Sequence, residues 1–190
     1  MSRSLDFVGG LKKRAVAARG YRIQISSKSG TKFRSQESFQ IELPTIARSY
    51  ADLANMYLMF DIKSTSSAAA NTGTLCSSAY DLFNRITISS GGGAVIDDCT
   101  NINRYYNAVL TQSVSHEFMQ GYSAECIGHK GDSGSPLGVT LPNANAVAKT
   151  ICVPLLHSVA TCSKLLPLDT AQGLNFTFYL EDFRNALVCN

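Results

Sequence analysis

Hydrophobic and polar residues alternate along several short stretches of the chain. In residues 174–180 (LNFTFYL), leucine and phenylalanine side chains fall on one side, and asparagine, threonine and tyrosine fall on the other. A two-residue period of this kind is typical of a β-strand with one buried face. The same period predicts four further strands, at residues 22–26, 38–43, 84–89 and 149–156.

Residues 56–63 (MYLMFDIK) are almost continuously apolar and are followed by a serine- and threonine-rich loop. A short apolar run of this length predicts a strand that is buried on both faces. The predicted core consists of alternate positions of all these strands: Ile23, Ile25, Phe39, Ile41, Leu58, Phe60, Ile86, Ile88, Ile151, Val153, Phe176 and Phe178.

Stretches rich in glycine, serine and asparagine separate the predicted strands, for example at residues 64–74, 89–93 and 141–146. These residue types favour turns. One segment, residues 98–111, has the spacing of a helix, with Asp98 or Thr100 as its cap. Many short strands joined by turns predict an all-β protein, a β-sandwich or barrel, in a single domain.

The charge is distributed unevenly along the chain. Residues 1–34 hold nine basic residues and one acidic residue, a net charge of +8, whereas the rest holds eight basic and thirteen acidic residues, a net charge of −5. We therefore predict a basic N-terminal arm over residues 1–34 and a folded domain over residues 35–190. A basic arm is typical of proteins that contact nucleic acid, but apolar residues among the bases also favour docking onto a neighbouring subunit. The candidates for phosphate contact are Lys12, Lys13, Arg14 and Arg19, and those for docking are Phe7 and Leu11.

Cysteine and histidine spacing predicts neither a metal site nor a cofactor. The six cysteines form no CxxC pair, and the three histidines form no His-x-His pair of the cupin type. The first residues lack the long apolar region of a secretion signal, so we expect reduced thiols and folding inside a cell. No run of about 18 apolar residues is present, and we expect no membrane-spanning helix.

Residues 131–136 (GDSGSP) are similar to the stretch that carries the nucleophile of chymotrypsin-like serine proteases. That chemistry needs a histidine base well upstream of the serine, and residues 1–115 contain no histidine. Glycine, aspartate, serine and proline are also ordinary turn residues. We therefore expect Ser133 to lie in a turn and the protein not to be an enzyme, with a serine protease as the weakest alternative.

Three segments, taken in order, resemble the jelly-roll capsid proteins of icosahedral viruses. They are LPTIARSYADLANMYLMFDIK, DLFNRITISSGGGAVIDDCTNINRYYNAVL and ICVPLLHSVATCSKLLPLDTAQGLNFTFYLEDFRNALV, and the likeness covers about residues 36–188. The likeness is greatest to the first roll of hexon-like major capsid proteins of the double-jelly-roll lineage. It implies an antiparallel jelly-roll β-sandwich with one short helix, present either as a single-roll protein or as one half of a two-roll subunit.

The resemblance implies a structural protein that forms the shell around a viral genome. Such a protein would be found in the virion, would assemble inside the host cell, and would bind copies of itself in trimeric or pseudo-hexameric capsomers as well as other capsid proteins. A non-viral, trimeric jelly-roll binding module of the lectin or cytokine type is the alternative. Low overall charge, 16%, suits extensive subunit contacts. The candidate contact residues, each of which could also pack in the core, are Tyr50, Tyr57, Tyr105 and Tyr106.

Overall fold

The computed structural model describes residues 20–65, 73–113, 115, 117, 121, 138–155, 157–158 and 164–189. Within these residues the protein consists mainly of antiparallel strands, which confirms the all-β class, and α2 is the one helix longer than a single turn. The elements are β1 (Ser38–Leu43), β2 (Tyr50–Ala51), β3 (Tyr57–Ile62), β4 (Gly73–Leu75), η3 (Ala79–Leu82), β5 (Phe83–Ser90), β6 (Val95–Thr100), α2 (Ile102–Ser113), β7 (Lys149–Pro154), β8 (Leu166–Pro167), β9 (Leu174–Leu180), α6 (Phe183–Ala186) and β10 (Leu187–Cys189).

The main layer is a four-stranded antiparallel sheet in the order β1-β9-β5-β6. Its register places Phe178 opposite both Phe39 of β1 and Ile86 of β5. Directly opposed residues share a face of the sheet, so the apolar positions of three strands meet on one side and are buried there. The alternation in the sequence therefore does define the inner face of this sheet.

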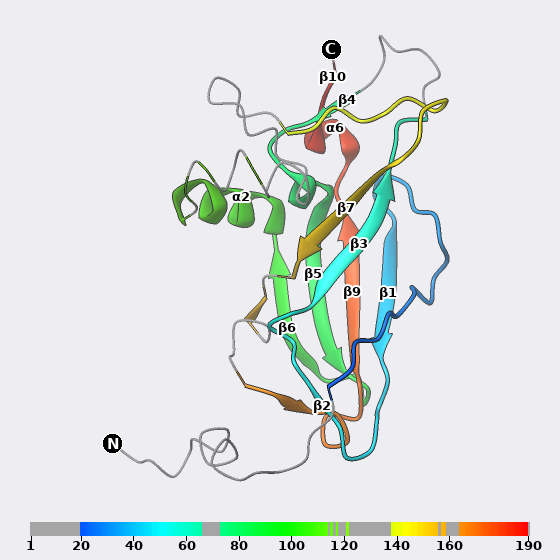
Figure 1. Cartoon of the computed structure of the whole chain (residues 1–190), viewed down its shortest axis with the longest axis vertical. Helices are drawn as coiled ribbons and strands as arrows, with labels where there is room; N and C mark the ends of the chain where they lie inside the picture. Colours follow the sequence, from blue (N-terminus) through cyan, green and yellow to red (C-terminus); the bar gives the residue numbers. More distant parts are fainter. Residues whose placement is uncertain are drawn as a thin grey trace.

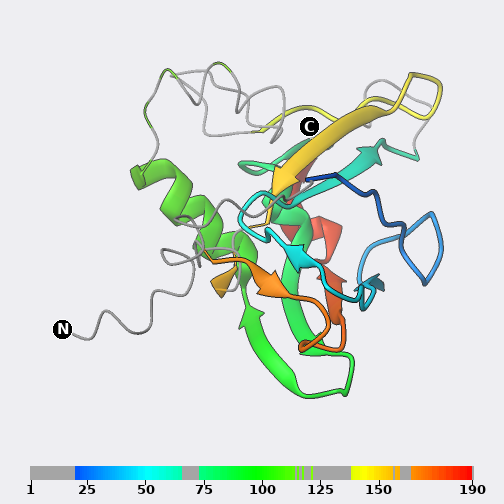
Figure 2. The same ribbon diagram turned by 60° about the horizontal axis from the view of Figure 1, so that its bottom comes forward.

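The second layer is the antiparallel pair β3–β7, which runs obliquely across the four-stranded sheet (Figure 1). The Phe60 ring of β3 packs edge-on against the Phe83 ring of β5, with their centroids 5.7 Å apart. Figure 2 shows the same layers from another side, with β7 near the top and the turn of the β5–β6 hairpin at the bottom. The buried core contains residues of both layers together with residues of η3, α2 and α6.

The strand pairs are nested along the chain. β1 pairs with β9, β2 with β8 and β3 with β7, and Thr74 of β4 forms a bridge to Thr140. Two chain segments, one from β1 to β4 and one from residue 140 to β9, are thus paired antiparallel at four successive places. The intervening residues 83–100 add the β5–β6 hairpin to the sheet that contains β1 and β9.

The structure corrects three of the sequence-based expectations. Residues 22–26 are not a strand and Ile23 is exposed, because this segment pairs with no strand. A backbone hydrogen bond to β1 follows only at Lys28, whose N–H donates to the Gln40 carbonyl at 2.8 Å. β3 is not buried on both faces, because Tyr57 and Met59 point away from the core. The helix begins at Ile102 rather than at residue 98, because the residues before it pair with β5 as strand β6.

A tight contact between two turns holds the end of the sheet. Gly91, in the turn after β5, lies so close to residue 172 that a Cβ on Gly91 would come within 1.9 Å of the Gln172 carbonyl oxygen. Gly91 N–H also donates to the Gly173 carbonyl at 3.1 Å. This contact leaves no room for a side chain, so residue 91 must be a glycine.

Replacing Gly91 with alanine should destabilise the fold by about 1–3 kcal/mol, because backbone atoms must move to relieve the overlap. Denaturant unfolding followed by circular dichroism measures the change. The matched control is Gly92→Ala, whose new Cβ would meet its nearest atom, in the Gln172 side chain, at an ordinary 3.5 Å. Equal stability of the two variants would contradict the packing described for this turn.

Candidate interaction surface

Three of the four candidate contact tyrosines are exposed on the described surface. The exposed fractions are 59% for Tyr50 in β2, 48% for Tyr57 in β3 and 59% for Tyr105 in α2. Among the described residues, no aromatic ring contact joins any two of these three tyrosines. They remain separate apolar points on the surface.

The fourth candidate, Tyr106, belongs to the core, and its assignment as a contact residue is wrong. It is 3% exposed and packs edge-on against Tyr80 with ring centroids 4.9 Å apart. Burial raises the pKa of its phenol above the ordinary value. Successive helical residues point about 100° apart, so Tyr105 and Tyr106 cannot both face the core, and only the tertiary packing selects Tyr106.

The outer face of the β3–β7 pair is apolar at one end and polar at the other. At the apolar end, Tyr57 lies opposite Pro154 and Met59 lies opposite Cys152. At the polar end, Asp61 lies opposite Thr150 and accepts a hydrogen bond from the Thr150 hydroxyl at 2.6 Å. Met59 is 60% exposed. Met59 is not among the contact residues predicted from the sequence, although strict alternation within residues 56–63 places it on the same face as Tyr57.

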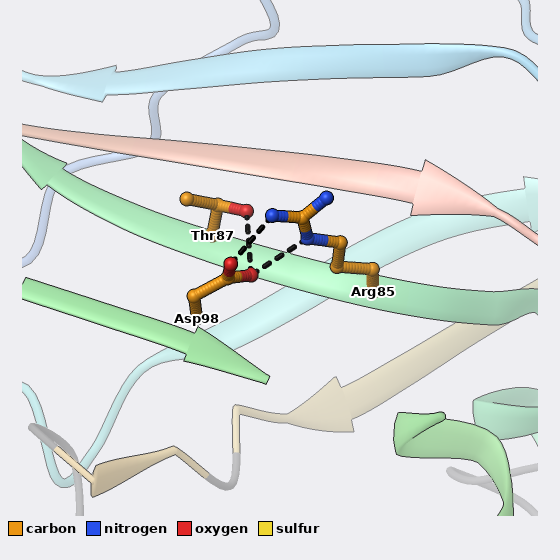
Figure 3. Close-up of polar contacts among 3 residues, drawn as sticks. All are labelled: Arg85, Thr87 and Asp98. Carbon is orange, nitrogen blue, oxygen red and sulfur yellow. Dashed lines mark hydrogen bonds and ion pairs between the residues drawn. The ribbon is translucent and has the colours of Figure 1, made fainter. Parts of the chain in front are cut away.

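The outer face of the four-stranded sheet is polar, and its central charges neutralise each other (Figure 3). The Arg85 guanidinium donates to both carboxylate oxygens of Asp98, at 2.6 and 2.5 Å, and the Thr87 hydroxyl donates to the same carboxylate at 3.1 Å. The hydrogen bonds from Arg85 are the main reason why the pKa of Asp98 is lowered. Asp98 is therefore an ion-pair partner within the sheet and not a helix cap.

A polar cavity of about 300 Å³ lies where η3, β5, α2 and α6 meet. Its centre is Glu181, which accepts side-chain hydrogen bonds from Asn84 at 2.6 Å, Asn103 at 3.1 Å and Asn185 at 3.1 Å. The Asp182 N–H also donates to it, at 3.1 Å. Burial acts to raise the pKa of Glu181, but these hydrogen bonds outweigh it and the pKa is lowered. The lining residues are Asp81, Asn84, Asn101, Asn103, Arg104, Asn107, Glu181 and Asn185.

This cavity ties elements together and has little spare capacity for a ligand. Each carboxylate oxygen of Glu181 already accepts two hydrogen bonds. The Asp81 carboxylate accepts hydrogen bonds from the Asn107 amide and from the backbone N–H groups of Ser77, at 2.6 Å, and Ser78, at 3.0 Å. Among the described residues no group of three or more His, Cys, Asp or Glu side chains has the arrangement of a metal site. We interpret the network as structural.

The basic arm lies largely outside the described residues, and so do all six of its candidate residues, Lys12, Lys13, Arg14, Arg19, Phe7 and Leu11. Ser133 also lies outside them. The described part, residues 20–34, contributes four exposed bases: Arg22, Lys28, Lys32 and Arg34. Of these, Lys28 forms an ion pair with Glu42 of β1, and Phe33 stacks on Phe39 at 4.8 Å. The end of the arm nearest the domain is therefore packed on the sheet.

Comparison with known proteins adds no assignment. No family model matches the sequence, and no curated protein matches it. Within the described residues, no helix has both the length and the apolar character needed to cross a membrane.

Replacing Glu181 with glutamine should lower the free energy of unfolding by about 1 kcal/mol at neutral pH, because a glutamine amide offers a donor where asparagine donors already point. The control is Glu37→Gln, at an exposed carboxylate that accepts one backbone N–H. The pKa of Glu181 is lower in the folded than in the unfolded state, so its contribution is fully present above the ordinary glutamate pKa of about 4.3 and is lost as the pH falls through the lower pKa of the folded state. Thermal unfolding across this range should show a smaller acid dependence for Glu181→Gln; an unchanged dependence would contradict the network.

Proposed function

We propose that this protein is a structural capsid protein of an icosahedral virus, built on a jelly-roll β-sandwich and acting by association with copies of itself. The observation that carries the proposal is the nested pairing of two chain segments, which lie within residues 38–75 and 138–180. The resemblance of the three sequence segments to capsid jelly rolls supports the same conclusion.

Nested pairing is what a jelly roll requires. In that fold antiparallel strands from the two halves of the chain pair and wrap into two facing sheets. Here β1 and β9 lie in the four-stranded sheet, whereas β3 and β7, the next long pair inward along the chain, lie across it. The β5–β6 hairpin departs from the regular pattern, because its two consecutive strands stay in one sheet.

The described surface also suits self-association. Tyr57 and Met59 are exposed side by side on one face of β3, and Tyr50 and Tyr105 are exposed on other elements. Tyrosine and methionine are enriched in protein interfaces, whereas most charged residues are depleted from interface cores. We propose that these residues contact neighbouring subunits in trimeric or pseudo-hexameric capsomers, together with other capsid proteins of the virion.

The arm has two proposed roles, which act on different partners. Its basic cluster, Lys12, Lys13, Arg14 and Arg19, would neutralise phosphates of the packaged genome and release counterions. Its apolar residues Phe7 and Leu11 would dock on an adjacent subunit.

The triple variant Tyr50→Ser, Tyr57→Ser and Tyr105→Ser should fold as the native chain does but fail to assemble, because these exposed side chains contribute to contacts and not to the core. Negative-stain microscopy counts the particles, and circular dichroism checks the fold. The control is Val147→Ser, a highly exposed residue in the loop before β7. Native protein that forms only soluble trimers would favour the lectin- or cytokine-like alternative and overturn the capsid proposal.

Two arm variants separate the two roles of the arm. Changing Lys12, Lys13, Arg14 and Arg19 to glutamine should abolish nucleic-acid retention while shells still form, since only electrostatic contacts are lost. Changing Phe7 and Leu11 to serine should reduce shell formation. The ratio of absorbance at 260 and 280 nm measures the nucleic acid in purified particles. If both variants assemble and package nucleic acid as the native chain does, the arm has neither role.

A further inference from the structure

Ser158, four residues after the end of β7, is hydrogen-bonded to β6. The backbone N–H and the hydroxyl of Ser158 both donate to Asp97 Oδ2, at 3.3 and 2.6 Å. The neighbouring His157 is 6% exposed, and its ring lies 5.7 Å from the Phe176 ring of β9. Residues 157 and 158 therefore contact two strands of the four-stranded sheet.

These contacts join the two layers. β7 belongs to the β3–β7 pair, whereas β6 and β9 belong to the four-stranded sheet. Asp97 lies opposite the buried Ile88, on the inner face of β6, and so points toward Ser158. The contacts thus hold the chain that leaves β7 against the inner face of the sheet beside its β6 edge.

The surroundings of His157 disfavour a charged imidazole. Burial lowers the pKa of His157, and Asp97 acts in the opposite direction without outweighing it. Cys99 of β6 and Tyr106 of α2 also face this region, and burial raises the pKa of both, so they are neutral. β9 contributes the uncharged Phe176, and Asp98 lies on the other face of β6 with Arg85.

We propose that His157 and Ser158 form an acid-sensitive latch, which stays bound to the four-stranded sheet while the imidazole is neutral and opens when the imidazole takes up a proton. The proposal rests on the burial of the His157 ring, on its contact with Phe176 of β9 and on the two hydrogen bonds from Ser158 to Asp97 of β6. It does not depend on the proposed capsid function.

The direction of the pH dependence follows from the linkage between protonation and opening. An exposed imidazole in the open state has an ordinary pKa of about 6.5, whereas the buried one has a lower pKa. Above the open-state value both states are neutral and the latch has its full stability. As the pH falls below about 6.5 the open state binds the proton more readily, and the latch weakens down to the pKa of the closed state.

Hydrogen exchange of the full chain at pH 7.5 and 5.5, corrected for the intrinsic rate, tests the latch. Peptides covering residues 151–158 and 95–100 should exchange about three- to tenfold faster at pH 5.5, since one proton changes the opening equilibrium by at most tenfold per pH unit. A peptide covering residues 38–43, on the far edge of the sheet, should not change. Equal corrected exchange of the first two peptides at both pH values overturns the proposal.

Variants assign the effect to one histidine. His157→Phe keeps an aromatic ring against Phe176 and removes the titrating group, so the acceleration at pH 5.5 should disappear. The double variant His116→Gln and His129→Gln removes the other two histidines of the chain and should keep it. Retention of the pH dependence in His157→Phe, or its loss in the double variant, contradicts the latch.

A direct titration covers the case in which His157→Phe does not fold. In the native protein, the His157 ring should protonate in NMR spectra at a lower pH than an ordinary histidine. Asp97→Asn should lower that pKa further, because the carboxylate favours the charged ring. A His157 pKa at or above the ordinary value would rule out the latch, and so would a rise of that pKa in Asp97→Asn.

Discussion

A continuous series of phenylalanine rings joins every layer of this structure. Phe33 of the N-terminal segment stacks on Phe39 of β1, which stacks on Phe178 of β9 at 4.9 Å. Phe178 contacts Phe83 of β5 at 5.9 Å, and Phe83 contacts Phe60 of the second layer. Aromatic pairs contribute about 0.5–1.5 kcal/mol each beyond the area that they bury. Because Phe178 is fully buried in the middle of the series, the position of both layers depends on it.

Polar interactions complete the domain where the phenylalanine series does not reach. At one end of the sheet, Glu181 directly follows β9 and gathers asparagine side chains from β5, α2 and α6. At the β6 edge, Asp97 holds the link that leaves β7. Both carboxylates fix elements that apolar packing alone would leave free to slide, since hydrogen bonds are directional and hydrophobic contacts are not. Tyr105 of the proposed assembly surface lies on α2, which Glu181 binds through Asn103, and the proposed latch is bound by Asp97.

The candidate site residues were predictable only in part. Tyr50, Tyr57 and Tyr105 are exposed as a contact role requires, whereas Tyr106 is buried against Tyr80. A sequence pattern gives the spacing of side chains around a helix but not its rotation relative to the core, so it could not separate the two neighbouring tyrosines. Ser158 and Asp97 are 61 residues apart in the chain, and no local pattern relates them. Their contact exists only because the tertiary structure places the chain that follows β7 beside β6.

The sequence by itself determined the strands β1, β5, β7 and β9 and the inner face of the main sheet, because a two-residue period reports directly which side chains share a face. It also determined the all-β class and the basic character of residues 1–34. Only the tertiary structure decided that Ile23 is exposed, that one face of β3 is open, and that residues 95–100 form a strand. In each of these cases the outcome depends on whether a partner strand or a covering layer is present, and that partner is distant in the sequence.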